Sequence, residues 1–136
     1  MVEIRAVYDG GLCCRVTHDP SGQTFQTDAP SDNHGQGAAI SPTDLLAASL
    51  GTCILTVMGI AAEGQHIELA GTTVRVQKEM SNAPVRRVVR LASTVTFPRR
   101  FSEEARALLE RTAKSCPVHH SLHPDIAVPI EFVYPS

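Results

Sequence analysis

The 136-residue sequence has no tryptophan, and its aromatic residues are limited to four phenylalanines and two tyrosines. It also lacks an excess of positive charge, because 12 Lys and Arg residues are outnumbered by 14 Asp and Glu residues. Proteins that bind nucleic acid or an anionic membrane surface normally present basic side chains, and single strands are also held by aromatic stacking. The composition therefore argues against both classes of partner.

The N-terminal residues lack the basic start and the apolar run of a signal peptide. We therefore expect a cytoplasmic protein, whose thiols are kept reduced. Only four cysteines are present. In a reducing compartment they indicate core packing, a metal site or a catalytic pair, rather than a structural disulfide framework.

The sequence contains no internal repeat, low-complexity tract or linker, so we expect a single domain over residues 1–136. The uncharged segment 45–62 is about as long as a membrane span. It contains Ser, Thr and Gly residues and has no flanking basic cluster, which favours a helix buried inside a protein. A chain this short cannot cover one helix on all sides, and we therefore expect an obligate homodimer.

Hydrophobic periodicity and turn residues predict an α+β fold. The expected order is strands, a long central helix, a strand pair, a second helix and a last strand. The strands are expected at 2–6, 12–17, 23–27, 72–80, 85–97 and 126–132, and the helices at 41–63 and 102–116. Pro129 favours an edge position for the last strand. The long loop 29–40 is typical of a lid or binding segment.

Two cysteines lie within or next to segments that are predicted to form helices. Cys116 precedes Pro117, so it is expected to cap a short helix, where backbone N–H groups favour the thiolate. Cys53 lies about 18 Å from the start of its helix, beyond the reach of the helix dipole. Local residue patterns therefore favour Cys116 as the reactive thiol and a core role for Cys53. A reactive Cys53 is the alternative, and it needs a cation or hydrogen-bond donors from elsewhere.

The remaining candidates are weaker. Cys13 and Cys14 are adjacent in a predicted strand, so one is expected in the core and the other exposed. Cys116 and three histidines have spacings compatible with zinc, but no second distant pair completes the ligand set. Those histidines are His119, His120 and His123. We therefore predict neither a metal site nor a cofactor.

Residues 41–53, from Ser41 to Cys53, resemble the central-helix signature of the OsmC/Ohr family. This family comprises the osmotically inducible and organic-hydroperoxide-resistance proteins. Residues 115–122 resemble the family's second cysteine motif, and the spacing and the order of elements also fit. The resemblance covers nearly the whole chain and is greatest to the general OsmC-like branch.

The resemblance implies an OsmC-like fold and an intertwined homodimer, with the long helices at its centre and active sites at the subunit interface. In peroxidase members, the cysteine corresponding to Cys53 attacks the peroxide and becomes a sulfenic acid. The cysteine corresponding to Cys116 then forms a disulfide with it, which requires Cα atoms within about 7 Å. A dithiol reductant of the lipoyl type restores both thiols.

The residues that activate the thiol differ from the family pattern. Peroxidase members have a Glu after the Pro of the central-helix motif, paired with an Arg from the N-terminal strands. Here Thr43 occupies the Glu position and Asp44 follows it, while Leu12 occupies the Arg position. Arg15 and Arg5 are the alternatives for the cation.

The sequence therefore predicts a thiol peroxidase that reduces organic hydroperoxides or hydrogen peroxide in oxidative stress defence. Cys53 and Cys116 are its predicted catalytic residues, and Arg15, Thr43 and Asp44 are candidates for substrate binding or thiol activation. The alternative function is a non-peroxidatic dimer that binds a small ligand in a pocket at the subunit interface.

Overall fold

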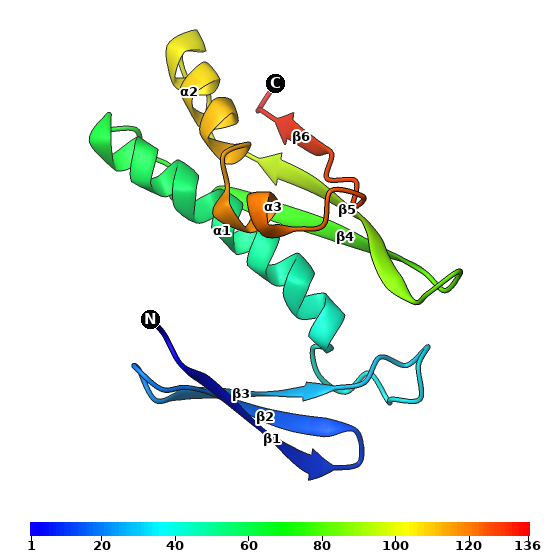
Figure 1. The fold of residues 1–136 in the computed structure, drawn as a ribbon. Coiled ribbons are helices and arrows are strands. Elements are labelled where there is room, and N and C mark those ends of the chain that lie inside the picture. The colour runs from blue at the N-terminus through cyan, green and yellow to red at the C-terminus, as the bar shows by residue number, and fades with distance from the viewer. The chain divides into compact units, whose positions relative to one another are not determined.

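The computed structural model describes all residues, 1–136, and the chain separates into two compact units. Unit 1 comprises Met1–Leu46 and unit 2 comprises Ala47–Ser136, and each is described by itself (Figure 1). The α+β fold class is confirmed, because both units contain a β-sheet and helices accompany the second. A single domain over residues 1–136 stays a prediction.

Unit 1 is a three-stranded antiparallel sheet in the order β1-β2-β3. Its strands are β1 (Ile4–Gly10), β2 (Cys13–His18) and β3 (Gln23–Asp28). A turn joins β2 to β3. Gly22 there adopts a φ of 71° and donates its N–H to the His18 carbonyl at 2.7 Å. Backbone positions with a positive φ favour glycine, which explains why Gly22 stands at the end of the turn.

The loop 29–40 is fastened to the buried carboxylate of Asp28. The Ala38 N–H donates to Asp28 Oδ2 at 3.0 Å, and the Ile40 carbonyl accepts the Asp28 N–H at 3.2 Å. The Ala38 N–H is the largest cause of the lowered pKa of Asp28, and it outweighs the opposing effect of burial. Gly35 is required in this loop, because a Cβ there would lie 1.8 Å from the Ala29 carbonyl oxygen.

Helix α1 (Pro42–Gly64) begins in unit 1 and continues through unit 2. The remaining elements of unit 2 are β4 (Thr73–Ser81), β5 (Arg87–Thr96), α2 (Glu103–Ala113), α3 (Pro117–Ser121) and β6 (Ile130–Val133). The sheet has the order β4-β5-β6, with β4 antiparallel and β6 parallel to β5. The helices of unit 2 lie on one face of this sheet (Figure 1).

The last strand lies at a sheet edge, as predicted, but it begins at Ile130 rather than at residue 126. Before it, only an isolated bridge joins Ala127 to Arg90. Pro129 explains the delay, because proline has no N–H to donate to a β-ladder.

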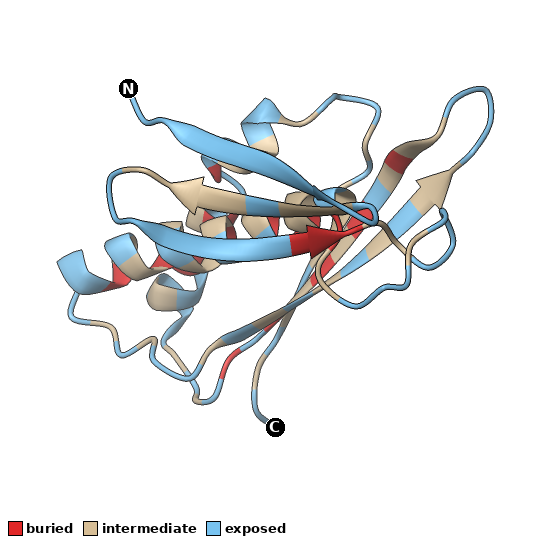
Figure 2. Ribbon diagram, turned by 90° about the horizontal axis from the view of Figure 1, so that it is seen from below, coloured by how far each residue is buried: buried red, intermediate tan, exposed pale blue.

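One face of α1 forms the core of unit 2. Leu50, Ile54 and Met58 are completely buried on this face, whereas Ile60 on the opposite side is 67% exposed. Figure 2 shows buried and exposed residues alternating along the helix. The single chain therefore covers α1 only in part, as its length led us to expect, and coverage by a partner stays a prediction. By length and composition alone, α1 is also apolar enough to cross a membrane.

Gly51 determines how closely α1 approaches the sheet. A Cβ at this position would lie 3.0 Å from Val76 Cγ2 and 3.1 Å from Val74 Cγ1 on β4, closer than most real contacts. Gly59 lies in the same helix, and a Cβ there would have no neighbour within 4 Å. The two glycines therefore differ in packing while sharing the same helical backbone.

We expect Gly51→Val to lower the free energy of unfolding by about 1–3 kcal/mol, because extra methyl groups overpack the contact with β4. Gly59→Val introduces the same side chain into the same helix and should change stability much less. Urea unfolding followed by circular dichroism measures both. Equal losses in the two variants would show that the helix–sheet contact at Gly51 is not tight.

Candidate thiol site

The structure brings Cys53 and Cys116 together within unit 2, although they are far apart in sequence. Cys53 lies in the middle of α1 and is half-buried, and Cys116 lies just before α3 and is completely buried. Both are free thiols. A side-chain hydrogen bond connects Cys116 with Cys53. Two thiols in contact can be oxidised to a disulfide by the loss of two electrons.

The α2 sequence explains why Cys116 points into the core. Ser102 caps this helix by accepting the Ala105 N–H at 3.1 Å, and the helix starts where the sequence predicted. Leu109 and Ala113 form the buried stripe of α2, and Cys116 extends the same spacing beyond the helix end. Pro117 then starts α3, whose first bond joins the His120 N–H to the Cys116 carbonyl at 3.2 Å.

The expectation that the cap position favours a Cys116 thiolate is wrong. Burial raises the pKa of Cys116 and is the largest cause, followed by the hydrogen bond to Cys53. The backbone N–H groups of His119 and Val118 lower this pKa, as the cap position implies, but their effect is smaller. Cys116 also makes no side-chain cap hydrogen bond. Desolvation therefore outweighs the helix terminus, and Cys116 is a neutral thiol.

Thr43 and Asp44 lie in the first turn of α1, where they stabilise its start. The Ser41 N–H donates to Asp44 Oδ2 at 3.0 Å, and the Asp44 N–H donates to Ser41 Oγ at 3.1 Å. The Thr43 and Ser41 hydroxyls lie 3.3 Å apart. This reciprocal pair is a capping box and confirms the predicted helix start. A role of Thr43 or Asp44 in thiol activation stays a prediction.

The two candidate cations both lie in unit 1 and form ion pairs there. Arg15 Nη2 lies 3.5 Å from Asp9 Oδ1, and Arg5 Nε lies 2.7 Å from Asp19 Oδ1. Their side chains are 54% and 65% exposed, respectively. Surface ion pairs of this kind contribute little to stability. The activating role of Arg15, with Arg5 as the alternative, stays a prediction.

Cys13 and Cys14 are both half-buried, so the expected division into one core and one exposed residue is wrong. Cys13 Sγ lies 3.7 Å from Asp28 Oδ1 and donates a hydrogen bond to it. Burial, and then the charge of Asp28, raise the pKa of Cys13. Sequence reasoning missed Asp28, because a single Asp at a strand end gives no sign that a loop will enclose it.

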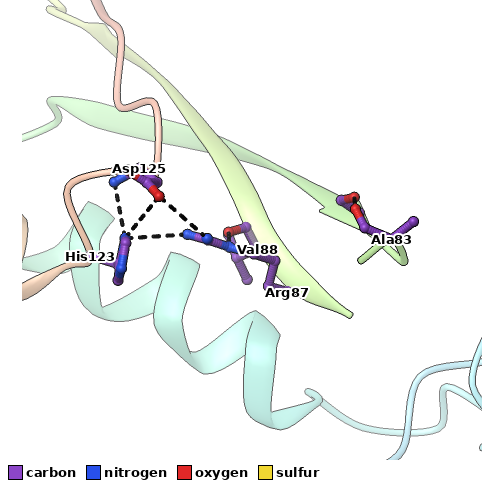
Figure 3. A network of polar contacts seen from close by, with 6 residues as sticks. Ala83, Arg87, Val88, His123 and Asp125 are labelled. Carbon is purple, nitrogen blue, oxygen red and sulfur yellow. Dashed lines mark hydrogen bonds and ion pairs between the residues drawn. The ribbon is translucent and has the colours of Figure 1, made fainter. Parts of the chain in front are cut away.

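The histidines near Cys116 separate into different environments. The Nδ1 atom of His119 is buried and has no hydrogen-bond partner. His123 Nδ1 accepts the Asp125 N–H at 3.1 Å and lies 3.5 Å from Arg87 Nη2, and Figure 3 shows these three residues converging. No group of three or more His, Cys, Asp or Glu side chains is arranged to hold a metal ion.

The arrangement of the elements is a fold seen in known proteins. A solved structure from Psychrobacter arcticus 273-4, provisionally described as an osmotic stress induced and detoxification response protein, is 39% identical. The match covers 99% of this chain and 96% of that chain, with a TM-score of 0.89.

Two more distant structures share the fold. Organic hydroperoxide resistance proteins from Legionella pneumophila and Elizabethkingia anophelis are each 20% identical, with TM-scores of 0.76 and 0.79. The matches cover 98% and 99% of this chain, respectively, and 96% of each of those chains.

The family model for OsmC-like proteins matches residues 35–131, which include both Cys53 and Cys116. The chain therefore belongs to the OsmC-like protein family, and the predicted family and fold are confirmed. No curated protein matches the chain.

The raised pKa of Cys116 has a consequence for stability at alkaline pH. In the window above the pKa of an unfolded thiol, about 8.5, the folded state keeps a proton that the unfolded state has lost. The contribution of Cys116 to stability should therefore be constant below this value and should fall as the pH rises, by at most about 1.4 kcal/mol per pH unit.

Between pH 8.5 and pH 10, we expect the free energy of unfolding to fall less steeply in Cys116→Ala than in the wild-type protein. The cavity left by the substitution adds a constant offset between the two. Urea unfolding with a phosphine reductant measures both proteins, and their offset between pH 6 and pH 8 is the control. Parallel curves over the alkaline window would contradict the assignment of a raised pKa to Cys116.

Proposed function

We propose that this protein is a cysteine-based thiol peroxidase that reduces organic hydroperoxides or hydrogen peroxide in oxidative stress defence. The observation that supports the proposal best is the contact between Cys53 and Cys116. Membership of the OsmC-like family and the fold shared with organic hydroperoxide resistance proteins support a peroxide-related stress role.

In this proposal, Cys53 is the nucleophile. Its sulfur attacks the terminal oxygen of the peroxide, the O–O bond breaks, and Cys53 becomes a sulfenic acid while an alcohol or water is released. Cys53 is the more accessible of the two thiols, since it is half-buried and Cys116 is completely buried. Neutral Cys116 is suited to be the resolving thiol. A thiol is a much weaker nucleophile than a thiolate, so Cys116 does not compete with Cys53 for the peroxide.

The Cys116 sulfur then attacks the Cys53 sulfenic acid, forming a disulfide with loss of water. A cytoplasmic dithiol of the lipoyl type is the proposed reductant, because two thiols on one small molecule can open the disulfide and close their own ring. The chemistry requires no metal or organic cofactor. Arg15, Thr43 and Asp44 are proposed to assist substrate binding or thiol activation.

A homodimer is part of the proposal. Unit 1 exposes large apolar side chains on β1, among them Ile4, Val7 and Tyr8, and α1 exposes Ile60. Clusters of exposed apolar side chains mark interaction sites in soluble proteins. A second copy of the chain is the proposed partner that covers them.

One observation favours the non-peroxidatic alternative. The Asp44 carboxylate accepts the Ser41 N–H in the capping box, and Thr43 occupies the position of the activating Glu in peroxidase members. In that case the protein would bind a small ligand at the subunit interface without reducing peroxide. The experiment on peroxide oxidation distinguishes the two functions.

We expect one equivalent of cumene hydroperoxide to convert the reduced protein into a form with one Cys53–Cys116 disulfide within seconds. Cys53→Ser should abolish the reaction, and Cys116→Ser should stop at a sulfenic acid that dimedone traps. Intact mass measurement and non-reducing peptide mapping identify each product.

The matched control is Cys14→Ser, which retains the pair and should behave as the wild-type protein does. Two free thiols after minutes with peroxide, or equal oxidation of Cys13 and Cys14, would refute the peroxidase proposal.

We expect light scattering to give twice the 14.6 kDa mass of one chain. Ile60→Glu places a charge on the exposed face of α1 and should dissociate the dimer, because a buried unpaired charge is costly. Val85→Glu is the matched control, since Val85 is 60% exposed in the turn between β4 and β5. A wild-type monomer, or equal effects of the two variants, would contradict a dimer built on α1.

A further inference from the structure

Four of the six aromatic residues of the chain gather at one place in unit 2. The Phe97 ring stacks on Tyr134 at a centroid distance of 4.7 Å and on Phe132 at 6.3 Å. Phe101 meets the Phe97 ring edge-on at 5.5 Å. Aromatic pairs at such distances stabilise one another beyond the area that they bury, so the four rings form one packed cluster.

A cavity of about 250 Å³ lies beside this aromatic cluster. It is lined by Arg100, Phe101, Arg106, Tyr134 and Pro135. These residues come from the segment before α2, from the first half of α2 and from the chain after β6. Neither cysteine of the thiol pair lines the cavity. An apolar cavity of about 150 Å³ can hold benzene, so this volume is sufficient for one ring with a small polar group.

An aromatic ring, rather than an acidic side chain, holds Arg106 at the cavity. Arg106 Cζ lies 3.9 Å from the centroid of the Tyr134 ring, in a cation–π contact. Glu110 lies one turn further along α2, where an ion pair with Arg106 would be ordinary. The Glu110 carboxylate instead accepts a hydrogen bond from the Tyr134 hydroxyl at 2.6 Å. Burial, and then this hydrogen bond, raise the pKa of Tyr134 to about 12, so the hydroxyl keeps its proton near neutral pH.

The two arginines of the cavity have no acidic partner. Neither Arg100 nor Arg106 takes part in an ion pair, and both are exposed, so a ligand can reach them. A guanidinium that stacks on a ring still has N–H donors at its edge, and their planar arrangement matches a carboxylate. Two positive charges at one cavity favour an anion there. The adjoining Phe101 and Tyr134 rings favour an anion with an apolar body.

We propose that this cavity binds a small organic carboxylate. The carboxylate group lies against Arg100 and Arg106, and the apolar body of the ligand packs on Phe101 and Tyr134. The binding is non-covalent and uses neither cysteine of the thiol pair. The inference therefore does not depend on the proposed peroxidase function.

Sodium benzoate is the test ligand, and nuclear magnetic resonance of the isotopically labelled full-length protein measures its binding. We expect the Nε–Hε signals of Arg100 and Arg106 to shift and saturate, with a Kd on the order of 1 mM. Inorganic phosphate lacks the ring and benzyl alcohol lacks the charge, and each should bind at least about tenfold more weakly. Equal binding of either compound would overturn the assignment of an organic carboxylate, and no saturable shift with benzoate would overturn the site.

Substitution of the arginines tests which residues hold the ligand. Arg100→Gln and Arg106→Gln should each weaken benzoate binding by about tenfold or more, because each removes charge-assisted hydrogen bonds. Arg111→Gln is the matched control, since it removes the same charge from α2 at a position that does not line the cavity. Circular dichroism verifies that the variants are folded. Wild-type affinity in Arg106→Gln, or equal losses in Arg106→Gln and Arg111→Gln, would refute the proposed site.

A last variant separates this site from the thiol pair. Cys53→Ser should bind benzoate as the wild-type protein does, because Cys53 does not line the cavity. Loss of benzoate binding in Cys53→Ser would place the ligand at the thiol pair and would overturn the inference.

Discussion

The contact between the Cys53 and Cys116 thiols depends on a small number of packing interactions. Gly51 lets α1 approach Val74 and Val76 on β4, and this fixes how closely the helix that carries Cys53 packs on the sheet. Cys116 continues the buried face of α2 and therefore lies in the core, and α3 begins directly after it at Pro117. Helix α1 and the segment between α2 and α3 thus bring the two thiols together.

Burial makes the two thiols unequal. The start of α3 directs two backbone N–H groups at Cys116, yet burial and the Cys53 hydrogen bond outweigh them and raise its pKa. A neutral, inaccessible thiol beside a more accessible one suits a resolving role, because it does not compete for peroxide and remains available for the sulfenic acid.

Features encoded by neighbouring residues could be predicted from the sequence. The caps at Ser41 and Ser102 and the edge position of the last strand follow from local rules, and the motifs around Cys53 and Cys116 carry the family resemblance. The ionisation of Cys116 could not be predicted, because its desolvation depends on packing between distant elements. The enclosure of Asp28 by the loop 29–40 and the unpaired Nδ1 of His119 also arise only in three dimensions.

The central claim is that Cys53 and Cys116 form one two-electron redox couple. Equilibration of the protein over a series of dihydrolipoate-to-lipoate ratios, followed by acid quenching, alkylation and mass measurement, tests it most directly. The account predicts a single two-electron transition in which two thiols per chain disappear together and map to a Cys53–Cys116 disulfide. Free Cys53 and Cys116 at the most oxidising ratio, or a disulfide that includes Cys13 or Cys14, would contradict it.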